Sequence, residues 1–292
     1  MTDAELAAFE ADIIAICAEH ESHWRDVDYR ACVSIESEKS KYFIKFDAPR
    51  TLWPEFSTQS YIHDYAIRHR NGPRIPQALH YFETQEKAFL VMEHIELTDP
   101  SLITNLAERT AWALAWLSRV SAPPEDVMGS SKDAMGPIGG GLIRHRFFKN
   151  NKAPLPFQSA ADLQVYINKG RKLLSNLAMD PAKPIIIIND PLIFTQSDMH
   201  VSNFGVDKCG NTVLLDFGQI GRLPLSFAKY TLESDEDDSF IARVANLLRW
   251  PDNSNMDSMA RVSSCLWMTS NPKLIRPPQW SKSLGSSFTP LT

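Results

Sequence analysis

Three side chains in the second half of the sequence are of the types, and at the spacings, that phosphoryl transfer requires. Asp198 is followed five residues later by Asn203, and Asp216 comes thirteen residues after that. Transfer of a phosphoryl group needs a carboxylate at the attacking hydroxyl, together with an amide and a second carboxylate that hold Mg²⁺ on the phosphates. The order acid, amide, acid therefore points to this chemistry.

The residues between Asn203 and Asp216 predict a β-hairpin. Residues 204–207 and 212–215 have the composition of short strands, and the polar segment 208–211, which contains a glycine, suits the turn between them. A hairpin of this length would bring Asn203 and Asp216 side by side at its open end. Two potential metal ligands would then face one ion.

Length and composition describe an ordinary globular protein of 292 residues, with 43 % hydrophobic and 22 % charged residues. The formal net charge of −5 argues against a nucleic-acid partner, which usually demands a basic excess. The acidic start is unlike a secretory signal, and every apolar run is too short to span a bilayer. We therefore expect a cytoplasmic protein with no membrane partner; its four scattered cysteines favour reduced thiols. The oligomeric state cannot be read from the sequence.

The elements that must position these residues begin with a small β-rich region. Helical spacing over residues 3–21, with Thr2 or Asp3 as the cap, predicts an N-terminal helix. Strands are predicted over residues 31–36, 42–46, 77–82 and 88–94, with a helix over 54–69 between the second and third. We expect one further strand, over Ser22–Asp28, before all of these.

After Ile95 helical spacing dominates. Helices are predicted over residues 107–120, 160–178, 239–249 and 259–267, and a long Gly-, Pro- and Ser-containing loop over 121–157. The predicted organisation is an N-terminal helix (1–22), an N-lobe (23–95), a C-lobe (96–270) and an irregular tail (271–292). This is an α+β chain whose small lobe is β-rich and whose larger lobe is mainly helical.

With these motifs in this order, the chain resembles the aminoglycoside phosphotransferase and choline kinase branch of the protein-kinase-like fold. The resemblance runs from about Ala31 to about Leu232 and is most specific over residues 193–221. It implies a two-lobed fold and an enzyme that uses ATP and Mg²⁺. It also implies that the γ-phosphate is transferred to a hydroxyl of a small molecule.

The same resemblance implies a role for each site residue of the N-lobe. Lys45, on the strand around Tyr42–Phe46, would grip the α- and β-phosphates, and Glu55 on the next helix would pair with Lys45. The hinge, whose backbone would bind the adenine edge, would be Met92, Glu93, His94 and Ile95.

In the C-lobe, the resemblance implies that Asp198 orients or deprotonates the acceptor hydroxyl. Asn203 and Asp216 would bind Mg²⁺. One departure from the family pattern lies beside them, because Gln196-Ser197-Asp198 stands where this branch usually carries His-Gly-Asp. The family histidine hydrogen-bonds backbone near the Asp-Phe-Gly turn, a role that Gln196 could partly fill.

A second departure concerns the phosphate loop. No glycine occurs between Met1 and Asn71, so a Gly-x-Gly-x-x-Gly hairpin is excluded and side chains would crowd the phosphates. A catalytically inactive protein that binds a nucleotide or metabolite is therefore one alternative. A protein kinase is a second, which the absence of an Ala-Pro-Glu motif after Asp216 disfavours.

The acceptor itself is open. The acidic run 233–238 favours a cationic acceptor in one interpretation and a solvated helix start in the other. The basic segment 144–146 would contact an anionic or aromatic acceptor, or would be a surface loop anchored by Phe147 and Phe148.

Overall fold

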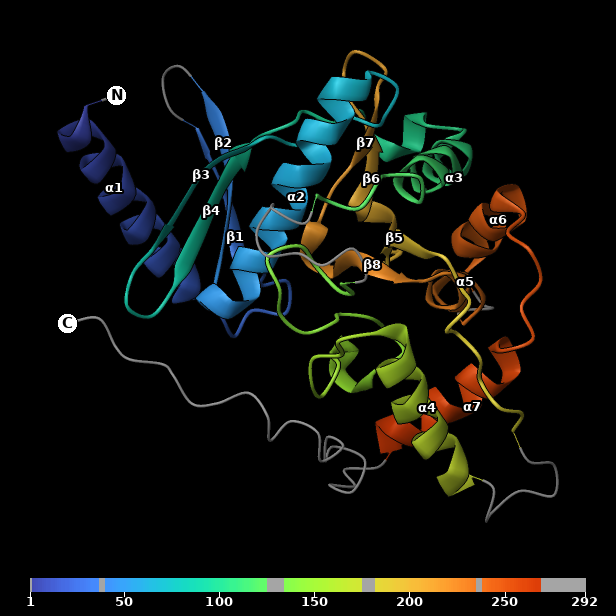
Figure 1. The fold of residues 1–292 in the computed structure, drawn as a ribbon. Helices are drawn as coiled ribbons and strands as arrows, with labels where there is room; N and C mark the ends of the chain where they lie inside the picture. Colours follow the sequence, from blue (N-terminus) through green and yellow to red (C-terminus); the bar gives the residue numbers. More distant parts are fainter. Residues whose placement is uncertain (1, 37–39, 125–133, 175–181, 235–237, 269–292) are drawn as a thin grey trace.

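A computed structural model describes residues 2–36, 40–124, 134–174, 182–234 and 238–268, which form two lobes (Figure 1). Their helices are α1 (Asp3–Glu21), α2 (Pro49–His69), α3 (Leu106–Leu117), α4 (Ala160–Leu174), α5 (Leu225–Glu233), α6 (Ser239–Leu248) and α7 (Met256–Met268). Their strands are β1 (Cys32–Glu36), β2 (Lys41–Asp47), β3 (Ala78–Glu83), β4 (Ala88–Glu93), β5 (Leu192–Gln196), β6 (Phe204–Val206), β7 (Thr212–Leu214) and β8 (Ile220–Pro224). The predicted tail (271–292) and part of the acidic run lie outside the described residues.

The N-lobe is an antiparallel sheet in the order β1-β2-β4-β3, with one helix on each face. Helix α1 covers one face, where Ile13 packs with Ile44 and Phe46 of β2. Helix α2 covers the other face and lies between the sheet and the C-lobe (Figure 1). Because side chains alternate along a strand, Lys45 points away from α1 and toward the gap between the lobes.

Helix α1 begins with reciprocal capping by Thr2, one of the two residues expected to cap it. The Thr2 hydroxyl accepts from the Glu5 N–H, and the Glu5 carboxylate accepts from the Thr2 N–H. The strand expected over Ser22–Asp28 is wrong, because these residues form turns that return to the end of α1. The side chains there are polar or, like Val27 at 95 % exposure, have no core to enter.

Helix α2 begins five residues earlier than predicted. Pro49 occupies its start, where a missing N–H costs nothing, and Pro54 lies inside the helix. The sequence offers two prolines that could start this helix, and the earlier one does so. Residues 49–53 therefore add a first turn that faces the C-lobe.

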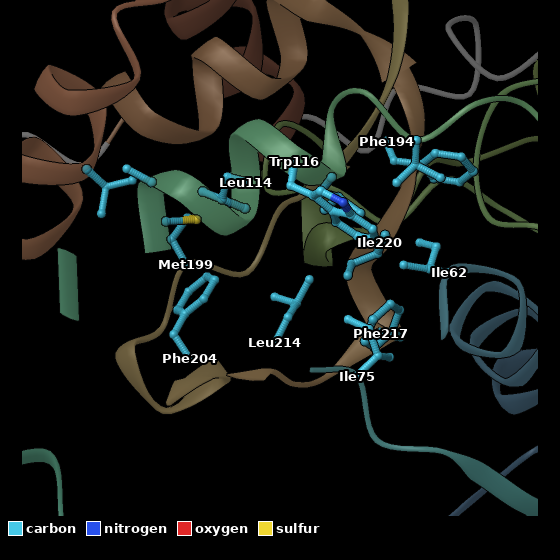
Figure 2. Packing of buried hydrophobic residues seen from close by; sticks show 14 of the residues in the cluster. Ile62, Ile75, Leu114, Trp116, Phe194, Met199, Phe204, Leu214, Phe217 and Ile220 are labelled. Atoms are coloured by element: carbon cyan, nitrogen blue, oxygen red, sulfur yellow. The ribbon is translucent and has the colours of Figure 1, made fainter. Parts of the chain in front are cut away.

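The C-lobe contains the α3–α7 helices and two small β-ribbons, β5–β8 and β6–β7. Figure 2 shows its main core, in which Trp116 of α3 lies with Phe194, Phe217 and Ile220. Ile62 of α2 enters the same cluster, so one apolar core spans both lobes. A second core joins α4, α5 and α7 to the segment 143–157, in which Phe147 and Phe148 are fully buried.

The architecture is therefore α+β and two-lobed, with a β-rich small lobe and a mainly helical larger lobe, as predicted. The ribbon β5–β8 and helix α5 were not predicted from the sequence. Among the described residues, no helix is both long and apolar enough to cross a bilayer.

Candidate active site

Lys45 of β2 joins the two lobes through a pair of carboxylates. Its ammonium group lies 2.5 Å from Glu55 Oε1 on α2 and 2.8 Å from Asp216 Oδ1 in the C-lobe. The Glu55 side chain is buried, with 7 % exposure, and that of Lys45 is nearly so. The structure thus brings together three residues that the sequence separates by up to 171 positions.

Burial and charge act in opposite directions on this cluster. Burial by itself would lower the pKa of Lys45, but the charges of Glu55 and Asp216 outweigh it and raise that pKa. Burial raises the pKa of Glu55, against the effect of Lys45. Asp216 also loses solvation, yet Lys45 and the Gly218 N–H hold its pKa below the ordinary value. Lys45 is therefore charged at neutral pH, and Asp216 is ionised.

Asp216 occupies a strained backbone position at the mouth of the β6–β7 hairpin. Its φ of 53° and ψ of 89° lie in the left-handed region, which non-glycine residues rarely adopt. Buried Phe217 and the 3.1 Å bond from Gly218 N–H to Asp216 Oδ1 hold it there. Such strain persists only where the surrounding structure imposes it, often at functional sites.

Gln196 connects the two acidic segments of the C-lobe. Its Nε2 donates to the Asp216 carbonyl at 2.8 Å, and its Oε1 accepts from the Asp198 N–H at 3.1 Å. The side chain is 1 % exposed. Glutamine here makes the backbone contact near the Asp-Phe-Gly turn that the sequence analysis assigned to the family histidine.

Asn203 is held by Asp198 and faces the same cavity as Asp216. Its Nδ2 donates to the Asp198 carbonyl at 3.1 Å, which leaves its amide oxygen as the group able to meet a cation. The Leu215 N–H bonds the Asn203 carbonyl at 2.9 Å, so Asn203 and Asp216 flank the open end of the hairpin. Asn203, Asp216 and Lys45 all line one cavity.

This inter-lobe cavity has a volume of about 550 Å³, within the range of small-molecule sites. The four predicted hinge residues Met92, Glu93, His94 and Ile95 line it, as do Phe43, Gln59 and Cys32. Buried Nδ1 of His94 has no hydrogen-bond partner among the described residues.

The side chain of Glu93 lines the cavity but is engaged in an ion pair. Its carboxylate pairs with Arg74 Nη2. Arg74 Nη1 lies 2.7 Å from Asp207 Oδ2 on the hairpin. Burial tends to raise the pKa of Asp207, but Asn211 and Arg74 lower it to about 2. This cluster ties the hinge to the C-lobe. The sequence analysis did not single out Arg74, because its partners lie 19 and 133 positions away.

Asp198 lies in a neighbouring, smaller cavity of about 250 Å³. Arg146, Asn151 and His200 line it together with Asp238, which caps α6 through the Phe240 and Ile241 N–H groups. His200 is exposed, and its Nδ1 contacts Ser202 Oγ at 2.7 Å. The described residues hold no group of three or more His, Cys, Asp or Glu side chains suited to a metal ion.

The basic segment 144–146 divides its side chains among different surroundings. His145 is fully buried, and burial lowers its pKa to about 3, so the ring is neutral. Its Nε2 lies 3.1 Å from the Phe227 carbonyl, and its Nδ1 accepts from the Phe147 N–H. Arg146 faces the Asp198 cavity, and Arg144 faces another. The segment is an anchored loop that presents two separate cations.

Comparisons with known proteins give only distant structural likeness. No protein-family model and no curated protein matches the chain. Among solved structures, a putative fructosamine-3-kinase from Haemophilus somnus 129PT is 10 % identical with a TM-score of 0.48, over 89 % of this chain and 95 % of that one. A spectinomycin phosphotransferase in complex with ADP and spectinomycin is 12 % identical with a TM-score of 0.49, over 82 % and 78 %. A choline kinase from Streptococcus pneumoniae is 12 % identical with a TM-score of 0.44, over 88 % of each chain.

Proposed function

We propose that the protein is a phosphotransferase that moves the γ-phosphoryl group of ATP to a hydroxyl of a small molecule. The observation that carries the proposal is the contact of Lys45 with both Glu55 and Asp216 across the lobes, beside Asn203. A buried ammonium group that faces an open cavity can hold phosphate oxygens. The nucleotide would bind with its base at residues 92–95.

The donor atoms fit Mg²⁺. This ion prefers oxygen ligands and is usually held by one or two carboxylates together with substrate phosphates. Asp216 supplies an ionised carboxylate and Asn203 an amide oxygen on the same cavity wall. When bound there, Mg²⁺ would offset the charge of the phosphates.

Asp198 would accept a hydrogen bond, and then the proton, from the attacking hydroxyl. Its carboxylate Oδ1 is already positioned by the His200 N–H at 3.1 Å, and its carbonyl by Asn203. Lys45 would hold the phosphates that are not transferred. Most of the rate increase would come from positioning and fixed charge.

The acceptor would enter the 250 Å³ cavity around Asp198, which suits a small polar molecule. Asp198 and Asp238 favour a cationic group there, whereas Arg146 favours an anionic one. The lining therefore gives no preference for the cationic acceptor considered from the sequence. The protein is also expected to act in the cytoplasm, without nucleic acid or membrane.

ADP release tests the proposal. A panel of small hydroxylated molecules is mixed with ATP, Mg²⁺ and either the parent or Asp198→Asn. We expect ADP release with at least one acceptor, and a fall in kcat of about 10²–10⁴-fold in the variant. Equal rates in both proteins would remove Asp198 from its role. Nucleotide binding without any transfer would favour the inactive alternative.

A further inference from the structure

A separate cavity of about 550 Å³ lies beside the first turns of α2. Its walls come from Ala48 and the first turns of α2, from the segment 137–152, and from Phe217 and Gly218. It therefore touches the helix that carries Glu55 and the turn that follows Asp216. This cavity has no role in the proposed function.

The charges around this cavity are unbalanced. Arg50, Arg144 and Lys152 line it, and the single lining carboxylate is Glu55, which already pairs with Lys45. Across the described residues, none of these three cations has a carboxylate within ion-pair distance, although the charge of Arg144 acts at longer range to lower the pKa of Glu55 and of Asp216. Arg144 makes one neutral hydrogen bond, from Nη2 to Thr51 Oγ1 at 3.2 Å.

Backbone pairing holds two of the cations side by side. Arg144 and Lys152 are partners in an isolated antiparallel bridge, so their side chains project to the same side. Like charges directly opposite each other are destabilising. The flanking residues Ile143 and Ala153 prevent the two cations from moving apart. The Ala153 N–H donates to the Ile143 carbonyl at 2.8 Å, and the side chains of Ile143 and Ala153 are buried.

The dipole at the start of α2 also acts on this cavity, and the Asp47 carboxylate offsets part of it. The helix N-cap, Ala48, has no side chain that accepts a hydrogen bond, and the first turn contains no acid. The Ala48 N–H donates to the Asp47 carboxylate at 2.6 Å and the Thr51 N–H to the Ala48 carbonyl at 2.8 Å, so few N–H groups at this end are free to bind an anion. Arg50 extends from this same turn. The positive charge at this cavity therefore comes mainly from the three cationic side chains.

The cavity also has an apolar wall. Trp53 is 37 % exposed, and Pro54 and Leu142 lie beside it. Gly141, with a φ of +103°, brings the opposite loop close to Pro54, where an added Cβ would lie 3.2 Å from Cγ. The volume is that of a drug-sized ligand site rather than that of a single inorganic anion.

We propose that this cavity binds a small phosphate monoester, with its phosphate at Arg50, Arg144 and Lys152 and its organic part against Trp53. The ligand bridges α2 and the segment 137–152. It thereby stabilises the first turns of α2, which carry Glu55, and with them the ion pair between Glu55 and Lys45. The site goes beyond the proposed function, since the ligand is neither the phosphoryl donor nor the acceptor.

Phenyl phosphate and inorganic phosphate are suitable probes, because they separate the organic part from the anion. Binding is measured by calorimetry at constant ionic strength, without ATP or acceptor. We expect phenyl phosphate to bind more tightly than inorganic phosphate. Arg144→Gln and Lys152→Gln should each weaken phenyl phosphate about tenfold or more. The matched control Arg119→Gln, at an exposed arginine of the C-lobe, should not.

A phosphate could instead enter the inter-lobe cavity at Lys45, and Lys45→Met separates the two sites. Phenyl phosphate binding that survives Lys45→Met but is weakened by Arg144→Gln supports the proposal. Binding lost in Lys45→Met and unchanged in Arg144→Gln overturns it, as does a parent that binds neither probe. Should Lys45→Met not fold, saturating ADP replaces it, and competition between ADP and phenyl phosphate overturns the proposal. Because no turnover is needed, these outcomes are independent of whether ATP is hydrolysed.

Discussion

The two sides of the inter-lobe cavity hold their functional groups in different ways. On the C-lobe side, Gln196 and Asn203 bond the backbone of Asp216 and Asp198, and both amide side chains are buried. On the N-lobe side, Lys45 is positioned by ion pairs alone. The segment that precedes the sheet, residues 22–30, consists of turns whose side chains are mostly exposed.

This difference explains how a chain without a glycine-rich loop could still bind a nucleotide. A phosphate loop works through backbone N–H groups and needs glycine to approach the phosphates closely. The C-lobe groups work through side chains and need only to be fixed in place. We infer that a bound nucleotide would be held mainly by Lys45 and residues of the C-lobe, with little contribution from residues 22–30.

The largest expected effect is on stability, at Lys45. Lys45→Met leaves Glu55 buried without its partner, which costs about 3–5 kcal/mol in the free energy of unfolding. Urea denaturation at neutral pH measures it. The double variant Lys45→Met/Glu55→Gln, which removes the buried charge as well, should recover part of the loss. A loss below about 1 kcal/mol in the single variant would show that the N-lobe side does not depend on this ion pair.

The next effect concerns the C-lobe network. Gln196→Ala removes two hydrogen bonds of a buried amide and should cost about 1–3 kcal/mol in the free energy of unfolding. Asn255→Ala, at a buried amide that donates to the Ile186 carbonyl at 2.7 Å and does not line the inter-lobe cavity, is the matched control for loss of a buried amide. Gln196→Ala should additionally weaken Mg²⁺-dependent nucleotide binding. Unchanged binding would mean that Asp216 holds its strained conformation without Gln196.

The ion-pair cluster of Glu93, Arg74 and Asp207, which joins the hinge to the hairpin, should affect the pH dependence of stability. The pKa of Asp207 is lowered from 3.8 to about 2, so its contribution is present above pH 3.8 and is lost as the pH falls toward 2. Asp207→Asn should therefore cost about 1–3 kcal/mol near neutral pH and less in acid. Unfolding by urea across this pH range measures the difference. Parallel curves for parent and variant would contradict this assignment.

The smallest expected effect is at Arg30, the residue of the turn segment that lines the cavity. Its side chain is exposed and bonds the neighbouring Tyr29 carbonyl at 2.8 Å. An exposed charge contributes about 0.2–1 kcal/mol, so Arg30→Ala should weaken nucleotide binding by less than about fivefold. A much greater loss would show that this segment grips the phosphates after all.

The sequence predicts well whatever depends on short spacing or alternation. The hairpin 204–215 places Asn203 and Asp216 as expected. Alternation along β2, in which Ile44 and Phe46 pack toward α1, turns Lys45 to the other side of the sheet. The start of α2 was misjudged because Pro49 and Pro54 carry the same local signal. The strand expected at Ser22–Asp28 failed because only the family pattern, and no apolar alternation, supported it.

Other features depend on contacts between distant segments, which no local pattern reveals. The pairing of β5 with β8 joins Leu192 to Pro224, and an ion pair joins Arg74 to Asp207. The cationic cavity combines Arg50 with residues about a hundred positions later. The roles of Asp198, Asn203, Asp216 and the hinge remain predictions, although their placement in the structure is compatible with each.

The most direct test of the central claim is calorimetric titration of the parent and of Asp216→Ala with ADP, each in Mg²⁺ and in EDTA. We expect the parent to bind ADP more tightly in Mg²⁺ than in EDTA, and Asp216→Ala to lose this difference. Equal affinity in Mg²⁺ and EDTA for the parent, or the same Mg²⁺ dependence in both proteins, would contradict a metal–nucleotide site at Asn203 and Asp216.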